Sequence, residues 1–147
     1  MFISILFMIC MFGIILFILM RTRDPPVFVE VKEKYKKLRD YIATNNVPQK
    51  FKVLTKQIVL IGYIKKKNEL GYNTNKGYEI GLCLDGTSNQ VFHVLLHELS
   101  HSTVTEYSHN DTFWQNFKEL RELAQNIGLY TPIPKTEAFC GKYIRDT

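Results

Sequence analysis

The chain has 147 residues and a formal net charge of +5, and its length allows one small domain with one or two additional segments. Outside the apolar N-terminal run it contains two cysteines, Cys83 and Cys140, too few for a disulfide framework, although a single bridge between them stays open. Residues 21–67 hold 13 Lys and Arg against 4 Asp and Glu, whereas residues 68–147 hold 6 against 10. The basic segment could attract anionic lipid or nucleic acid, but a solvated helix face followed by a basic loop accounts for most of its charge.

Residues 1–20 contain no charged side chain and predict a transmembrane anchor. At a rise of about 1.5 Å per residue, twenty helical residues span about 30 Å, the thickness of the hydrocarbon core of a bilayer. No basic residue precedes the run and no small-residue cleavage site follows it, which favours an uncleaved anchor over a secretory signal. Because Arg21 and Arg23 follow the run, the positive-inside rule places the rest of the chain on the cytosolic side. We therefore expect a single-pass membrane protein, with a short linker at residues 21–26.

The region from residue 27 to residue 84 predicts a helix followed by two strands. An amphipathic helix is expected over residues 27–44, where apolar side chains recur at spacings of four, three and four: Val31, Tyr35, Leu38 and Ile42. Residues 57–64 form a short β-branched apolar run that predicts a buried strand. Residues 71–77 have the composition of a turn, and the alternation of apolar residues over 78–84 predicts a half-buried strand.

Two further helices are expected in the second half of the chain. Thr87 and Gln90 have the spacing of a capping box, which predicts the start of a helix whose inward side chains are Val91, Val94, Leu95 and Leu99. A second amphipathic helix is expected to start near Asn110 or Asp111 and to end at Gly128. The tail over residues 131–147 contains two prolines and no clear period.

The four histidines of the chain all fall between residues 93 and 109. His97 and His101 are four residues apart on the predicted helix, so both imidazoles lie on one face and could bind adjacent corners of one tetrahedral Zn²⁺. The third ligand must come from elsewhere; His109 is the candidate that we favour, with Glu106 and Asp111 as alternatives.

Glu98 lies between the two helical histidines, so its carboxylate would be close to the metal without binding it. A carboxylate in that position could act as general base toward a zinc-activated water. His93 precedes His97 by one turn on the same face, and we expect it to pack or to hydrogen-bond behind the ligands.

Residues 57–130 resemble the WLM-domain metallopeptidases and their SprT-like (Spartan-like) relatives, which are compact zincins. Three segments carry the resemblance. Residues 71–80 are similar to the Gly-x-Asn-x-Asn-x-Gly segment that precedes a strand in that family, residues 95–101 contain the His-Glu-x-x-His motif, and residues 109–114 match its His-x-x-x-Phe-Trp segment.

The resemblance implies an α+β, zincin-like metallopeptidase domain over residues 27–130, behind the N-terminal anchor and before the tail at 131–147. It also implies that His97, His101 and His109 bind Zn²⁺ and that Glu98 is the general base.

The expected activity is zinc-dependent hydrolysis of peptide bonds in a protein or peptide substrate. Glu98 would take a proton from water and pass it to the leaving amine. Tyr107 is a candidate donor to the developing oxyanion. The strand at 78–84 is expected to be an edge strand, which could bind an extended substrate by β-addition.

Two other functions stay open at this point. The first is a membrane or structural protein that keeps the zincin fold without turnover, but a structural zinc site would not need Glu98. The second is a nucleic-acid-associated, WLM-type protease acting on DNA-bound proteins, with the basic segment 21–67 as its interface. The lysines of that segment lack interleaved aromatic residues on which bases could stack, so nucleic acid is not the favoured partner.

Overall fold

The computed structural model describes residues 2–21, 23–64, 69–106 and 108–146. Along the chain its helices and strands are α1 (Phe2–Arg21), α2 (Pro26–Thr44), the 3₁₀ helix η1 (Gln49–Thr55), β1 (Val59–Tyr63), β2 (Gly71–Thr74), β3 (Glu79–Cys83), α3 (Ser88–His101), α4 (Asp111–Asn126), β4 (Glu137–Phe139) and β5 (Lys142–Ile144). This mixture of helices with a small mixed sheet confirms the α+β class.

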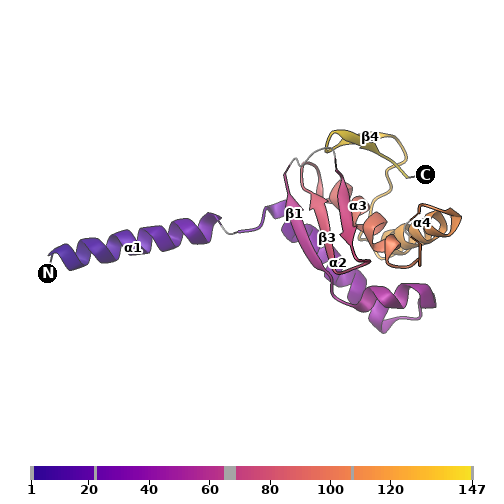
Figure 1. The fold of residues 1–147 in the computed structure, drawn as a ribbon, viewed down its shortest axis with the longest axis horizontal. Coiled ribbons are helices and arrows are strands. Elements are labelled where there is room, and N and C mark those ends of the chain that lie inside the picture. Colours follow the sequence, from indigo (N-terminus) through magenta and orange to yellow (C-terminus); the bar gives the residue numbers. More distant parts are fainter. Residues whose placement is uncertain (1, 22, 65–68, 107, 147) are drawn as a thin grey trace.

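The N-terminal helix α1 extends away from the rest of the structure, and its described side chains, those of residues 4–20, are all exposed (Figure 1). Crossing a bilayer requires about 20 consecutive apolar residues. Among the described residues, no helix combines the length and the apolar character that such a crossing demands. The structure therefore does not support the predicted transmembrane anchor at residues 1–20. The single-pass membrane localisation, the membrane partner and the cytosolic orientation depended on that anchor and are corrected with it.

Helix α2 confirms the helix that the apolar spacing predicts. It begins at Pro26, where a proline is tolerated because the first N–H groups of a helix have no intrahelical acceptor. Its inward face is buried: Phe28, Val31, Tyr35, Leu38 and Ile42. The helix packs against η1 and against α3.

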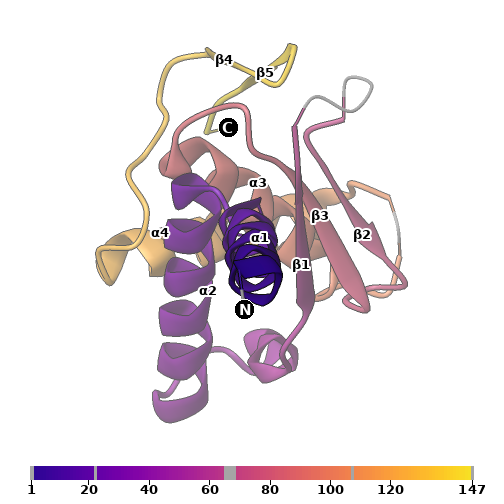
Figure 2. The same ribbon diagram turned by 90° about the vertical axis from the view of Figure 1, so that its left-hand side faces the viewer.

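The central sheet has the strand order β1-β3-β2, with β1 parallel and β2 antiparallel to β3 (Figure 2). Two expectations are wrong. The strand at 57–64 is an edge strand rather than a buried one, and Val59 is 61% exposed. Strand β3 is central, so residues 78–84 offer no free edge for a substrate; the edge beside it is β2, which forms within the segment expected to be only a turn. Pairing with β3 supplies hydrogen bonds that the local composition of residues 71–74 does not predict.

Helices α3 and α4 begin and end close to the predicted residues. The capping box of α3 is formed, since the Thr87 side chain accepts from the Gln90 N–H while the Gln90 side chain accepts from the Thr87 N–H. The Asn110 side chain caps α4 by accepting from the Phe113 N–H. Gly128, which was expected to end this helix, has a positive φ of 73°. Helix α3 contacts α2, α4, β2 and β3, so it forms the centre of the fold.

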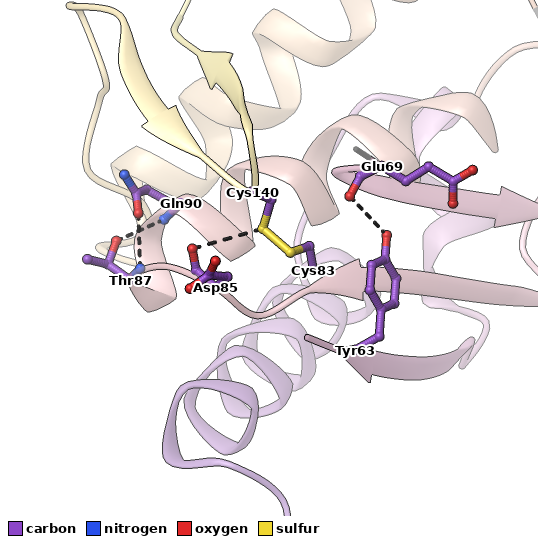
Figure 3. The surroundings of a disulfide bond; sticks show 7 residues. All are labelled: Tyr63, Glu69, Cys83, Asp85, Thr87, Gln90 and Cys140. Carbon is purple, nitrogen blue, oxygen red and sulfur yellow. Dashed lines mark hydrogen bonds between the residues drawn. A yellow bond between two sulfur atoms is a disulfide. The ribbon is translucent and has the colours of Figure 1, made fainter. Parts of the chain in front are cut away.

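The C-terminal tail is not irregular, because β4 and β5 pair as an antiparallel hairpin. Its two connecting residues, Cys140 and Gly141, both have positive φ, which matches the twist of a tight two-residue turn. Cys140 forms a disulfide with Cys83 at the end of β3, so the bridge that the sequence left open is present (Figure 3).

The last described residue, Asp146, fastens the tail to the helices. It forms an ion pair with Arg121 of α4 and accepts hydrogen bonds from the Tyr130 hydroxyl at 2.6 Å and from the Ile133 N–H at 2.9 Å. Together with the disulfide, these contacts hold the hairpin on the same core as the rest of the domain.

Candidate metal centre

The three histidines that the sequence singled out lie together at the C-terminal end of α3. Along that helix, His97 and His101 face the same side, with ring centroids 5.2 Å apart. His109 reaches them from the start of α4, where the Asn110 cap fixes the direction in which the chain enters that helix. The Nε2 atoms of His97 and His109 are 3.0 Å apart, and the three potential ligand atoms all lie within 4.8 Å of one another.

Phe113 is the side chain that supports this cluster from behind. It is fully buried one turn into α4, and its ring centroid lies 4.4 to 4.9 Å from the rings of His97, His101 and His109. Trp114, which is partly exposed, stacks on His109 with ring centroids 5.5 Å apart. The cap of α4 and these two aromatic rings therefore fix the position of His109, and this explains chemically why a Phe-Trp pair follows that histidine.

The electrostatic environment suits a cation bound by neutral imidazoles. Burial lowers the pKa of His97 to about 3, with further lowering by the neighbouring histidines. Burial, together with His109 and Lys76, lowers the pKa of His101 to about 4. Neutral imidazole is the form that binds a metal. Three nitrogens at this separation fit one tetrahedral ion, for which bonds of about 2.0–2.1 Å place the nitrogens about 3.3 Å apart.

Glu98 is the buried acid beside the histidines. Glu98 is 7% exposed, and burial raises the pKa of its carboxyl group to about 7. It lines a cavity of about 360 Å³ together with His97, His101 and His109. Gly71 of β2 lies so close that a Cβ there would come within 3.2 Å of the Glu98 Cγ atom, so the glycine lets the strand approach α3 at this point.

Asn73 and Lys76, which the sequence did not single out as individual site residues, connect the β2 turn to this site. Asn73 donates from Nδ2 to the Glu98 carbonyl at 2.7 Å and accepts from the Gly77 N–H at 2.7 Å, so one side chain holds both the turn and the helix. Lys76 donates to the carbonyls of Val104 and Thr105 in the connection between α3 and α4. The only sequence signal for these contacts is the repeated Asn within residues 71–77, which the family resemblance included.

The C-terminal hairpin forms another wall of the cavity, through Lys142 and Ile144. The sequence did not predict this wall, because it depends on the disulfide and on the Asp146 contacts, which join residues far apart in the chain.

The remaining candidates lie elsewhere. Glu106 accepts hydrogen bonds from Ser108 and Asn110. Asp111 lies at the start of α4 beside a different surface hollow. Within the described residues, the cluster close enough to hold a metal ion contains the three histidines and neither acid. Tyr107, the candidate oxyanion donor, lies outside the described residues.

His93 lines the same cavity as Glu98, one helical turn before His97. Its Nδ1 atom lies 2.8 Å from the Tyr130 hydroxyl, and its ring contacts Phe117, which also contacts His97. Burial lowers the pKa of His93 to about 4, which keeps the imidazole neutral.

An α+β domain with a histidine cluster beside a buried glutamate defines a candidate metal-dependent hydrolase. Comparison with protein families identifies the family: the WLM domain matches residues 36–141, and the chain belongs to the WLM family. A solved structure, the metallopeptidase zymogen of Pyrococcus abyssi abylysin, is 16% identical, with a TM-score of 0.43, and the match covers 69% of this chain and 97% of that one. A comparison with curated proteins gave no match. Membership of the WLM family supports a metalloprotease-type function with a protein substrate.

Proposed function

We propose that this chain is a zinc-dependent metalloprotease of the His-Glu-x-x-His type. In this proposal His97, His101 and His109 hold Zn²⁺ and Glu98 is the general base. The observation that carries the proposal is the convergence of three imidazoles beside one buried carboxylate in a cavity.

Zinc is the metal that we propose because three imidazole ligands are typical of catalytic zinc, which keeps a fourth position open for water or substrate. When bound, Zn²⁺ would lower the pKa of water and polarise a substrate carbonyl. The chain itself must then supply a group that moves the proton.

Glu98 is the group on this chain that can move a proton at the site. It is buried beside His97 and His101, and its carbonyl is held by Asn73, so its backbone is fixed relative to the histidines. Its carboxylate would accept a proton from the attacking water and deliver it to the leaving amine, which needs hydrogen-bond reach in both steps.

The substrate would enter the cavity between the hairpin and β2. Strand β2 lies at the sheet edge next to α3, and its residue Asn73 contacts the Glu98 backbone. An extended substrate paired with β2 would therefore run past Glu98. This replaces β3 as the candidate strand for β-addition.

The test is zinc content measured together with proteolysis on the full chain. Protein purified in non-ionic detergent, which keeps the exposed apolar side chains of α1 dispersed, should bind close to one Zn²⁺ per chain and cleave an unfolded protein substrate. A chelator should abolish cleavage and added Zn²⁺ should restore it. Folded protein that cannot be loaded with zinc would overturn the proposal. Protein that holds zinc but cleaves nothing would favour the structural alternative instead.

A further inference from the structure

A second groove, with a volume of about 600 Å³, lies between α2 and the start of β1. One wall is the outward face of α2, and the other is formed by residues 57–60. The groove shares no lining residue with the metal cavity, which lies toward the opposite edge of the sheet, beside β2. The groove is therefore a surface feature separate from the metal cavity.

The strand wall of this groove has unpaired main-chain groups. Strand β1 pairs with β3 along one side, and the Tyr63 carbonyl accepts from the Leu84 N–H on that side. Main-chain groups of successive residues in a strand alternate in direction, so those of Leu60 and Gly62 face away from β3. Within the described residues, no further strand pairs with that outer side. Such an edge is a template for another extended chain.

The helix wall of the groove is basic. Lys32, Lys36 and Arg39 line it, spaced three or four residues apart on one face of α2, and Asp40 is the acidic residue among the lining side chains. Lys32 also forms an exposed ion pair with Asp24, just before the helix, at 2.6 Å. Lys36 lies 3.4 Å from Asp40 in an exposed pair, which contributes little to stability and is easily exchanged for another acidic group. Arg39 is held in place by its hydrogen bonds to the Thr55 carbonyl and by stacking on Tyr35.

Apolar side chains complete the surface. Ile58, Val59 and Leu60 line the strand side of the groove, and Val59 is 61% exposed, which is unusual for a β-branched residue of a sheet. The groove thus combines main-chain hydrogen-bonding groups and apolar contacts with three cationic side chains, two of which are paired with exposed carboxylates that an acidic ligand could replace.

We propose that this groove binds an extended, acidic segment of a partner protein, which adds to the sheet as a strand beside β1. Main-chain pairing with Leu60 and Gly62 would supply the alignment, and acidic side chains would contact Lys32, Lys36 and Arg39. A nucleic acid fits less well, because it lacks the peptide N–H and C=O groups that a strand edge recognises, and the aromatic residue of the groove, Tyr35, is buried. The site would recruit a protein independently of the metal centre, so the proposal does not require the proposed protease activity.

The binding test uses fluorescence anisotropy with the full chain in non-ionic detergent, carrying Glu98→Gln so that the probe cannot be cleaved. The probe is a labelled peptide of four Glu-Val repeats, compared with four Gln-Val repeats. We expect the Glu-Val peptide to bind at least about tenfold more tightly, and its affinity to fall as salt rises. Equal binding of both peptides, or no binding of either, would overturn the proposal.

A pair of matched variants locates the site. Lys32→Glu with Lys36→Glu should weaken Glu-Val peptide binding at least about tenfold. Lys118→Glu with Lys135→Glu makes the same change in net charge at exposed positions outside the groove, and it should alter affinity by less than about twofold. If both pairs of substitutions weakened peptide binding equally, net charge alone would account for the affinity. That result would contradict binding in the groove. Thermal unfolding of each variant checks that it is folded.

Hydrogen exchange measured by mass spectrometry tests the strand pairing itself. The bound peptide should slow amide exchange in residues 59–63 and leave residues 71–74 unchanged. Protection confined to residues 71–74 would mean that the peptide is bound only as a substrate, and would overturn the proposal. Single-stranded DNA is the competing ligand. If it displaced the peptide and its own binding were also weakened by the Lys32 and Lys36 substitutions, the groove would be reassigned to nucleic acid and the proposal would be overturned.

Discussion

The Nε2 atoms of His97 and His109 lie 3.0 Å apart, although these histidines are twelve positions apart in the chain and the end of α3 lies between them. The contact results from the Asn110 cap, which starts α4 next to the end of α3, and from Phe113, which packs against both rings. With His101 beside them, the two nitrogens are placed to share a cation.

Removing His109 should therefore weaken metal binding. His109→Ala is expected to lower zinc affinity by at least about a hundredfold while leaving the fold intact, because the residue is exposed. Competition with a chromophoric chelator measures the affinity. Glu106→Gln and Asp111→Asn, which alter the rival ligands, should bind zinc as the parent does. A loss of zinc in either of these variants, with His109→Ala unaffected, would assign the third ligand to that acid.

Removing the Phe113 ring should lower the free energy of unfolding. Phe113→Ala deletes a fully buried ring and should cost about 3–5 kcal/mol of unfolding free energy. Trp114→Ala serves as the comparison, because Trp114 is 42% exposed and its loss should cost less. Urea unfolding of both variants gives the two values. If the two substitutions cost the same, Phe113 would not be the support that its contacts with all three histidines indicate.

The disulfide should stabilise the hairpin wall of the cavity. The Cys83–Cys140 bridge joins residues 57 positions apart, and a loop of that size corresponds to about 4 kcal/mol of stabilisation in the chain-entropy model. Cys83→Ser with Cys140→Ser should lower the unfolding free energy by up to that amount. Cys10→Ser, which removes the exposed free cysteine, is the control and should change stability little. A double variant as stable as the parent would show that the bridge is not formed in solution.

Stability should also fall at acid pH because of Asp146. Burial acts to raise the pKa of Asp146, but hydrogen bonds from Tyr130 and Ile133 and the contact with Arg121 outweigh it and lower that pKa. A group with a lowered pKa in the folded state stabilises the protein above its unfolded pKa of about 3.9 and loses that contribution as pH falls. Asp146→Asn should therefore be less stable than the parent at pH 7 and approach it near pH 3.

Unfolding measured across this pH range tests that expectation. Asp40→Asn, at an exposed position, is the control and should show the parent's pH dependence. If Asp146→Asn lost the same free energy at pH 7 and at pH 3, the contribution of Asp146 would not depend on its charge.

The parts of the fold that depend on local chemistry could be predicted from the sequence. The capping box at Thr87 and Gln90, the start of α4 near Asn110 and the four-residue spacing of His97 and His101 each involve residues within one or two turns of a helix. Those features are present in the structure. The spacing of apolar residues likewise predicted α2 and α4 correctly, because the buried face of an amphipathic helix is formed by residues three or four positions apart in its own sequence.

The parts that depend on distant partners could not be predicted. Strand β2 has a turn-like composition and becomes a strand only by pairing with β3, and this pairing moves the free edge from β3 to β2. The hairpin β4–β5 is too short to show a period, and its place beside the metal cavity comes from the disulfide to Cys83 and from Asp146. The apolar run at residues 1–20 predicted a span that the described residues do not support.

The most direct test of the central claim is Glu98→Gln in the full chain. Glutamine keeps the size of the side chain and leaves the three histidines in place, but it cannot take a proton from water at neutral pH. The variant should bind zinc and unfold as the parent does, and its cleavage of an unfolded protein should fall by about 10²–10⁴-fold, the usual contribution of a general base. Glu122→Gln, an exposed glutamate on α4, should cleave at the parent rate. If Glu98→Gln held zinc and cleaved as fast as the parent, Glu98 would not be the base and the proposed mechanism would be contradicted.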